Sequence, residues 1–322
     1  MPPDHQPSDA DDLILGGLYG LLIGDAVGVP YEFSKPSKMP RLELIEMDEP
    51  RGFRAHPDAP PGAWSDDGAQ ALCLLVSLIE RGRLDVDDLG ERLLEWLDSG
   101  YMAVDGVVFD VGMQTDAALS ALRAGTPANE SGPTGEYDNG NGSLMRVLPL
   151  ALWHTGSDTE LIENAALQSL VTHGHARSQI CCALYCLWAR ATLHEEADPW
   201  ASAVRGMREH CETKPTWQRE LERHIRPDSK PGGRGSGYVV DTLHSARLAA
   251  EEPNFERAIQ RAISLGDDTD TTAAVAGGIV GLRDGLSSIP KRWLSALAGR
   301  SIVDPLALEL LANRDEPERG RR

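Results

Sequence analysis

The sequence predicts an all-α protein, and two observations support that fold class. Apolar residues recur at three- and four-residue steps, for example at Leu72, Leu75, Val76 and Ile79, and this spacing places them on one face of an α-helix. Stretches in which apolar and polar residues alternate between tight turns, the pattern of half-buried strands, are nearly absent. We therefore expect helices joined by long loops.

The expected helices follow this periodicity along the chain. They cover residues 12–24, 66–81, 85–98, 111–124, 143–154, 159–171, 176–194, 199–211, 236–250, 254–265, 270–283 and 290–298. Glycine and proline gather between them, mainly in segments 36–62, 125–142 and 227–237. Loops of this kind on a rigid scaffold often carry binding residues.

No internal boundary is visible in the chain. Its 322 residues suffice for one large domain or two, but neither a repeat nor a shift in composition divides them. We expect a single domain over residues 11–312. The ends, 1–10 and 313–322, are expected to be flexible tails.

Acidic residues outnumber basic ones. The chain has 31 Lys and Arg residues against 50 Asp and Glu residues, a formal net charge of −19. This surplus repels phosphate backbones and anionic lipid headgroups, which disfavours nucleic-acid and membrane partners. The first residues lack the pattern of a secretion signal, and no run of 18 apolar residues occurs. We expect a cytoplasmic protein and a monomer.

The five cysteines do not form a recognisable framework. Their number is odd, and Cys181, Cys182 and Cys186 lie in one apolar segment. Neither disulfide pairing nor paired zinc ligands fit this distribution. We expect buried, reduced thiols that pack as small apolar side chains.

An acidic motif, WSDD (64–67), stands directly before the helix expected over 66–81. Ser65 or Asp66 can cap that helix, because oxygen atoms there accept hydrogen bonds from free backbone N–H groups and suit the helix dipole. For this motif alone, capping is the simpler interpretation.

A second acidic motif, GDDTDTT (266–272), precedes a helix rich in alanine and glycine. Capping explains one Asp or Thr, but it does not readily explain three aspartates in four positions. Two like charges about 4 Å apart repel by about 4 kcal/mol at an effective dielectric constant of about 20. Converging carboxylates therefore protonate, spread apart or hold a cation. If the two motifs meet in space, their oxygen atoms suit two Mg²⁺ or Mn²⁺ ions.

Glu32 is a candidate for proton transfer. It lies between aromatic residues in PYEF (30–33), after the glycine-flanked end of the first helix. Burial there raises the pKa of a carboxyl group towards the range in which it exchanges protons at neutral pH. The alternative is an ordinary surface glutamate in a turn.

Three further segments are candidates for ligand contacts. The glycine-rich turn NGNGS (139–143) leads into a helix and offers N–H donors to a phosphate, although it is neither a P-loop nor a dinucleotide fingerprint. Asp110 opens another helix, as its cap or as a ligand for a sugar hydroxyl. His173 has no cysteine or third histidine near it, so we expect it to form hydrogen bonds rather than bind zinc.

Taken in order, seven segments resemble the ADP-ribosylglycohydrolase family, which includes the dinitrogenase reductase-activating glycohydrolases. They are GDAVG…YE (24–32), WSDDGAQAL (64–72), FDVGMQTDAAL (109–119), NGNGSLMRVLPLAL (139–152), THGHA (172–176), GYVVDTLHSA (237–246) and GDDTDTTAAVAGGIVG (266–281). The resemblance extends from about residue 12 to about residue 300. The S-D-D and D-x-D-T elements are highly specific as a pair.

The resemblance implies a compact multi-helix fold with a binuclear Mg²⁺ or Mn²⁺ centre at the base of a cleft. By this resemblance the metal ligands are Ser65, Asp66, Asp67, Asp268, Asp270 and Thr271. Glu32 would lie near the metals or their bridging water. The residues that surround the ADP-ribose in similar proteins correspond to Asp110, Asn141, Gly142, Ser143, Met145 and His173. Asp267 is left out, because many relatives have glycine there.

The implied reaction is hydrolysis of the bond between C1″ of the distal ribose and an acceptor, commonly an arginine guanidino nitrogen or a serine oxygen of a modified protein. Two cations would hold the ribose hydroxyls and activate a water molecule. Glu32 or Asp110 would assist proton transfer, and the pyrophosphate would lie over the turn 139–143.

Two departures from the family pattern affect substrate identity more than metal binding. Gly68 and Gln70 stand where relatives often have Thr and Met, and the loops that face the acceptor are not diagnostic. Two other functions stay open at this point. One is a relative that binds ADP-ribose without turnover, and the other is a hydrolase of O-acetyl-ADP-ribose or another small ribosyl compound.

Overall fold

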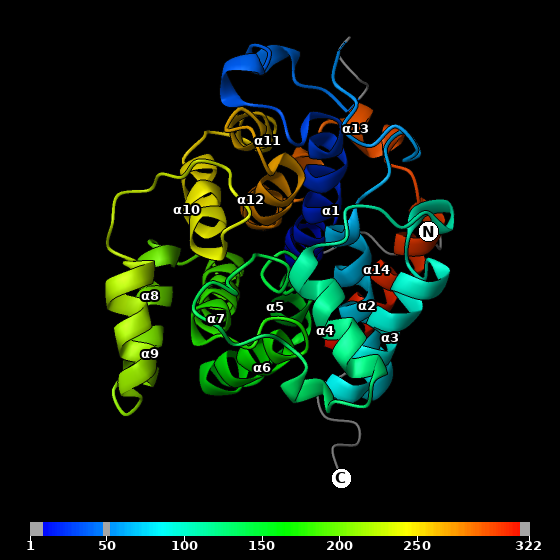
Figure 1. Cartoon of the computed structure of the whole chain (residues 1–322). Helices are drawn as coiled ribbons and strands as arrows, with labels where there is room; N and C mark the ends of the chain where they lie inside the picture. Colours follow the sequence, from blue (N-terminus) through cyan, green and yellow to red (C-terminus); the bar gives the residue numbers. More distant parts are fainter. Residues whose placement is uncertain (1–8, 48–51, 316–322) are drawn as a thin grey trace.

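Helices make up the regular structure of this protein. The computed structural model describes residues 9–47 and 52–315. Within these ranges every regular element is helical, and β pairing is limited to one isolated bridge between Gly140 and Tyr238 (Figure 1). The predicted all-α fold class is confirmed.

Long segments without α-helix precede α2, α5 and α10, and the other connections between α-helices are shorter. Their bounds are α1 Asp9–Gly28, α2 Asp66–Arg81, α3 Val86–Ser99, α4 Met113–Arg123, α5 Leu148–Trp153, α6 Asp158–Leu170, α7 Ala176–Leu193, α8 Pro199–Cys211, α9 Pro215–Arg219, α10 Val239–Ala250, α11 Phe255–Ile263, α12 Thr269–Asp284, α13 Lys291–Ala296 and α14 Arg300–Asp315. Short 3₁₀ turns and one π-helical turn, η6 (Glu220–Ile225), complete the set.

The periodicity is a good guide to most helices and fails in identifiable places. Residues 143–147, expected as the start of a helix, form turns, and α5 begins only at Leu148 with Pro149 in its first turn, a position that proline favours. The sequence reading did not identify α9, η6 or α14. Helix α14 contains Pro305, which interrupts the usual helix signal. The predicted tails lie mostly outside the described residues.

Helices α1 and α12 cross at the centre of the molecule with their backbones in contact (Figure 1). A Cβ atom added to Gly20 would lie 2.3 Å from the carbonyl oxygen of Gly277, and one added to Gly277 would lie 2.2 Å from that of Gly20. A Cβ at Gly28 would lie 2.4 Å from the Cα of Asp270. The two helices run antiparallel, so the end of α1 lies against the start of α12.

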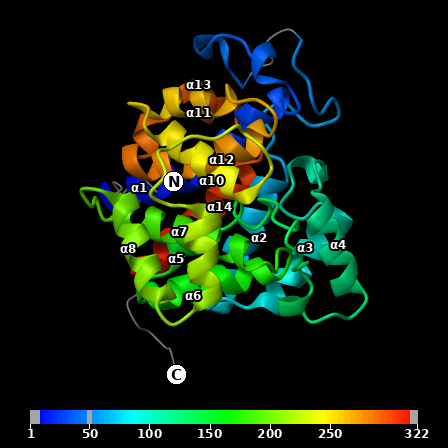
Figure 2. The same cartoon turned by 60° about the vertical axis from the view of Figure 1, so that its left-hand side comes forward.

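The other helices surround this pair. Helices α5 to α8 gather on one side, and α2 to α4 on the other (Figure 2). In the described part of the chain, α1 is also the single helix long and apolar enough to cross a membrane, but 89% of its most apolar window is buried in the protein. Helix α1 is therefore a core helix. All five cysteines are buried and free, as predicted.

Candidate active site

The two acidic motifs begin helices α2 and α12. Ser65 caps α2, since its side-chain oxygen accepts a hydrogen bond from the backbone N–H of Asp67. Asp268 occupies the corresponding position of α12 but makes no side-chain cap hydrogen bond. Capping therefore accounts for Ser65 and leaves the carboxylate of Asp268 for other contacts.

The two motifs meet although 204 residues separate their contacting members. Thr271 Oγ1 donates a hydrogen bond to Asp67 Oδ2 at 3.2 Å, and Ser65 Oγ donates to the same oxygen at 3.3 Å. Asp67 and Asp270 are fully buried, and Asp66 and Thr271 are nearly so. The close approach of α1 and α12, together with the packing of α2, brings these side chains together.

Within residues 9–47 and 52–315, none of the converged carboxylates forms an ion pair. In the same ranges Asp67 Oδ1 and Asp270 Oδ2 are buried without a hydrogen-bond partner, an expensive arrangement for acceptor atoms. Burial, followed by repulsion from neighbouring carboxylates, raises the pKa values of Asp66, Asp67 and Asp270 well above the ordinary range. Buried oxygen ligands with uncompensated negative charge fit a divalent cation of the Mg²⁺ or Mn²⁺ type.

Asp25 is a functional candidate that the sequence reading missed. It is fully buried at the end of α1, and its carboxylate accepts hydrogen bonds from the backbone N–H groups of Ser65 (2.9 Å) and Gly68 (2.8 Å). Burial raises the pKa of Asp25 to about 7. Through these hydrogen bonds, Asp25 connects the start of α2 to the end of α1. The available signal was an aspartate directly following the apolar stretch of α1.

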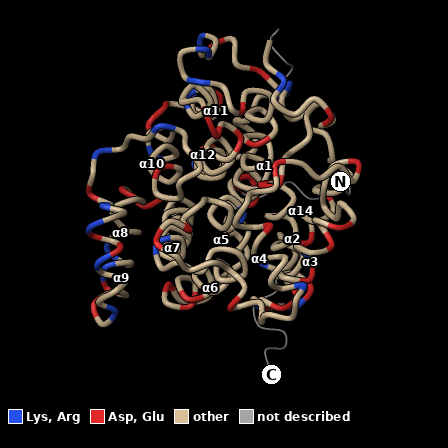
Figure 3. The backbone as a smooth tube through the Cα atoms, viewed as in Figure 1, with Lys and Arg blue, Asp and Glu red and all other residues tan. Residues whose placement is uncertain are grey.

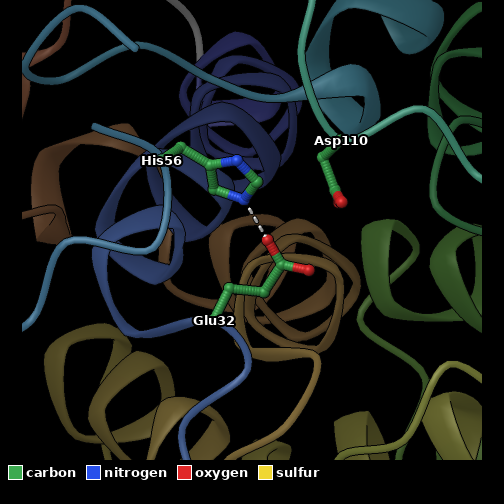
Figure 4. Close-up of side chains that lie close together, drawn as sticks. All are labelled: Glu32, His56 and Asp110. Atoms are coloured by element: carbon green, nitrogen blue, oxygen red, sulfur yellow. Dashed lines mark hydrogen bonds and ion pairs between the residues drawn. The ribbon is translucent and has the colours of Figure 1, made fainter. Parts of the chain in front are cut away.

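Glu32, His56 and Asp110 form a second group beside the acidic motifs (Figure 4). One potential ligand atom from each lies within 4.8 Å of the others. His56 Nε2 forms a short hydrogen bond with the Glu32 carboxylate, and Asp110 faces this pair from another loop (Figure 4). Glu32 is only 5% exposed, so it is not an ordinary surface glutamate.

Burial sets the proton affinity of this group. Burial, with smaller contributions from Asp268 and Asp25, raises the pKa of Glu32 to about 8. Burial and the neighbouring Glu32 raise the pKa of Asp110 to about 7. The sequence reading also missed His56, which is a lone histidine in the long loop 36–62. Its ring packs 4.9 Å from that of Phe109, and burial lowers its pKa.

A cleft of about 700 Å³ lies above these carboxylates. The predicted site residues on its wall are Glu32, Asp66, Asp110, Asn141, Gly142, Met145, His173, Asp268 and Thr271. Those that lie outside its lining are Ser65, Asp67, Asp270 and Ser143. The first three of these belong to the converged motifs. Ser143 is fully buried behind the wall, where its hydroxyl accepts a hydrogen bond from Ser169.

The glycine-rich turn joins the cleft wall to the second acidic motif. Asn141 Nδ2 donates to Asp268 Oδ2 at 2.8 Å. The N–H of Asn141 donates to the carbonyl of Gly237, and that of Gly140 donates to the side chain of Gln114. Two N–H groups are thus already used, so the turn offers fewer donors to an anion than the sequence suggests.

His173 makes hydrogen bonds, as expected. Its Nδ1 lies 2.8 Å from Thr172 Oγ1, and the imidazole is almost completely buried. Burial and the nearby Arg146 lower the pKa of His173 to about 3, so the ring is neutral at physiological pH.

Three residues at the cleft adopt a backbone conformation that favours glycine. Phe33, Asp110 and Asp267 have φ angles of 60°, 54° and 55°, a region that non-glycine residues rarely occupy. The segments of Phe33 and Asp267 are joined by two backbone hydrogen bonds, of 2.7 and 2.8 Å. Backbone strain of this kind is typical of functional sites.

Comparison with known proteins identifies the family. A profile of the ADP-ribosylglycohydrolase family matches residues 6–320. The chain is 34% identical over 311 residues to the ADP-ribosylarginine hydrolase Tri1 of Pseudomonas putida (strain GB-1), covering 94% of this chain and 79% of that protein. It is 30% identical over 288 residues to the ADP-ribosyl-[dinitrogen reductase] glycohydrolase of Rhodospirillum rubrum, covering 89% of this chain and 90% of that protein.

A solved structure shares the fold. It is an ADP-ribosylglycohydrolase-related protein complex, with a TM-score of 0.75 and 32% sequence identity, and the alignment covers 95% of this chain and 99% of that one. Family profile, sequence relatives and structural neighbour agree over almost the whole length, and therefore the chain belongs to the ADP-ribosylglycohydrolase family of hydrolases.

Proposed function

We propose that the protein releases ADP-ribose from arginine side chains of modified proteins, by hydrolysing the bond between C1″ of the distal ribose and a guanidino nitrogen. One observation carries the proposal: the motifs 64–67 and 266–272 meet at the base of a single cleft, through the hydrogen bond from Thr271 to Asp67. The similarity to ADP-ribosylarginine hydrolases supports arginine as the acceptor.

The base of the cleft suits two divalent cations, Mg²⁺ or Mn²⁺. The ligands we propose are Ser65, Asp66, Asp67, Asp268, Asp270 and Thr271. The unpaired carboxylate oxygens of Asp67 and Asp270 support this set, because a cation satisfies both the buried acceptors and the surplus of negative charge. When bound, such cations orient the ribose hydroxyls and lower the pKa of a coordinated water.

Glu32 and Asp110 are the proposed groups for proton transfer. Both line the cleft, and their raised pKa values place them near neutrality, where a carboxyl group exchanges protons most effectively. A protonated Glu32 can donate to the departing guanidino nitrogen. His56, which is outside the lining of the cleft, holds the Glu32 carboxylate in place through its hydrogen bond.

The cleft wall supplies the proposed contacts to ADP-ribose. Asn141, Gly142, Met145 and His173 lie on it, and the neutral His173 ring adds no charge. Ser143 acts indirectly in this proposal, since its hydroxyl faces the interior. The carboxylates around the cleft attract a cationic guanidinium acceptor more strongly than a neutral one.

We also propose a cytoplasmic location. The five cysteines are free and buried, which suits a compartment that keeps thiols reduced.

The activity is tested with an ADP-ribosylarginine peptide, purified protein and Mg²⁺ or Mn²⁺, with free ADP-ribose measured by chromatography. We expect metal-dependent release that chelation removes. Asp67→Ala and Asp268→Ala should abolish release while the protein stays folded, because each removes a proposed ligand of the cations. Asp87→Ala, at an exposed acidic position of α3, is the matched control and should retain activity.

The same assay separates the alternatives. Binding of ADP-ribose without turnover of arginine, serine or small-molecule substrates would indicate a binding protein. Turnover of O-acetyl-ADP-ribose alone would indicate a small-molecule hydrolase. Full activity after thorough chelation would contradict the metal-dependent mechanism.

A further inference from the structure

Arg146 is a fully buried cation whose hydrogen bonds, within the described residues, all go to neutral oxygens. Its guanidinium donates to the side chain and the backbone carbonyl of Gln168, both at 3.0 Å, to the carbonyl of Gly142 at 3.4 Å and to Gln70 Oε1 at 3.1 Å. No ion pair in the described ranges includes it. Burial lowers its pKa to about 10. A buried charge without a counter-ion is costly, so its retention calls for a reason.

Gln70 connects this cation to the acidic base of the cleft. It is fully buried on α2, one turn after Asp66, and its Nε2 donates to Asp66 Oδ2 at 3.2 Å. Its Oε1 accepts from Arg146 at 3.1 Å. An arginine only donates and a carboxylate only accepts, so an amide side chain suits the position between them. The two partners also fix which way the amide points.

Asp66 needs such a partner. Asp66 is almost fully buried on the cleft lining, and within the described residues the side-chain hydrogen bond to its carboxylate comes from Gln70. A neutral donor holds the Asp66 carboxylate in one orientation without competing for the cation. Outer partners of this kind orient metal ligands, and their loss commonly weakens metal binding.

We propose that Gln70 is a positioning residue for the metal centre: it fixes the Asp66 carboxylate for a divalent cation, and the buried Arg146 in turn fixes Gln70. This inference rests on the proposed function, because it requires that Asp66 binds a cation. It departs from the expectation above that the change at position 70 affects substrate identity more than metal binding, because the structure places Gln70 on Asp66.

The hydrogen bonds that join Asp66, Gln70 and Arg146 continue to the cleft wall. Arg146 donates to the carbonyl of Gly142, and Gln168, which it also contacts, donates from Nε2 to the carbonyl of Ser143 at 3.1 Å. One guanidinium therefore ties together a proposed metal ligand and the turn that lines the cleft. In this arrangement the buried guanidinium holds both Gln70 and the glycine-rich turn in position.

The test is the affinity of the full chain for Mn²⁺. It is measured by calorimetry or by the electron paramagnetic resonance signal of free Mn²⁺. Gln70→Met has a similar length but neither donates nor accepts the two hydrogen bonds. We expect Mn²⁺ to bind about 10- to 100-fold more weakly to this variant. Gln260→Met, at a buried glutamine of α11 outside this set of contacts, is the matched control: Mn²⁺ affinity should match wild type even if the melting temperature falls.

A second variant covers the case in which Gln70→Met does not fold. Gln70→Asn keeps a polar amide but is one methylene too short to reach both partners, and it should also weaken Mn²⁺ binding. Wild-type affinity in a folded Gln70 variant would overturn the inference, as would an equal loss in Gln260→Met. Failure of the wild-type protein to bind Mn²⁺ would instead contradict the proposed metal centre itself.

Discussion

Single side chains in the cleft depend on partners that are distant in sequence. The carboxylate of Glu32 is held by His56, 24 positions later, and that of Asp25 is held by the N–H of Ser65, 40 positions later. In both cases a contact with a residue distant in sequence fixes the position of the carboxylate, and the residue type alone does not.

His56 provides a test at this scale. His56→Ala should lower kcat for ADP-ribosylarginine hydrolysis by about 10-fold or more, because the Glu32 carboxylate loses the group that orients it. KM should change little, since His56 does not line the cleft. His56→Gln retains a donor and should recover part of the rate.

His210→Ala, at a histidine of α8, is the control for that measurement and should leave both constants unchanged. An unaltered kcat in His56→Ala would mean that Glu32 is positioned without it.

The residues of 266–272 indicated a site because three aspartates in four positions exceed what helix capping requires, whereas the metal-binding role of 64–67 was implied by the resemblance to the family. It did not predict Asp25 or His56, because a single aspartate at the end of an apolar helix and a single histidine in a loop carry no pattern. Their roles appear only when folding brings α1, α2 and the loop 36–62 together.

At the scale of elements, the close crossing of α1 and α12 determines the geometry of the site. Gly20 and Gly277 let the two backbones touch. The end of α1 then supplies Asp25, and the start of α12 supplies Asp268 and Asp270. A wider separation of the helices would draw these carboxylates apart.

Gly20→Ala should therefore destabilise the protein by about 1–3 kcal/mol, because its methyl group would clash with the Gly277 carbonyl at 2.3 Å. Gly206→Ala is the matched control in α8, where the nearest atom outside its own helix backbone would lie 3.6 Å away. That change should stabilise the protein by about 0.5–1 kcal/mol. Chemical denaturation measures both, and an equal effect of the two changes would contradict the close crossing.

Helix prediction worked where apolar spacing was regular and failed where local chemistry overrode it. Helices α2 and α12 begin within a residue of expectation, because their polar starts and apolar faces agree. The start of the segment 143–154 forms turns because the glycine-rich segment before it folds back onto the cleft wall. Helix α14 tolerates the internal Pro305 because its apolar face packs on the rest of the protein.

At the scale of the whole molecule, the net charge of −19 is not spread evenly. Lys and Arg residues are conspicuous along α8, α9 and the loop that follows (Figure 3), whereas Asp and Glu residues are prominent over α2 and α3 and around the central helices. A negative field of this kind raises the local concentration of divalent cations and of cationic acceptor side chains. The composition predicted the negative net charge but not where carboxylates gather. Their concentration at the cleft arises because segments from opposite ends of the chain meet there.

The most direct measurement of the central claim is the number of Mn²⁺ ions bound per chain, in the wild-type protein and in Asp67→Asn and Asp270→Asn. We predict two ions for wild type and fewer for each variant. Each variant should also melt at a higher temperature than wild type without metal, since an amide at these buried positions is not repelled by the neighbouring carboxylates. Two ions bound with unchanged affinity in both variants, or none in wild type, would contradict the claim that these carboxylates jointly hold the cations.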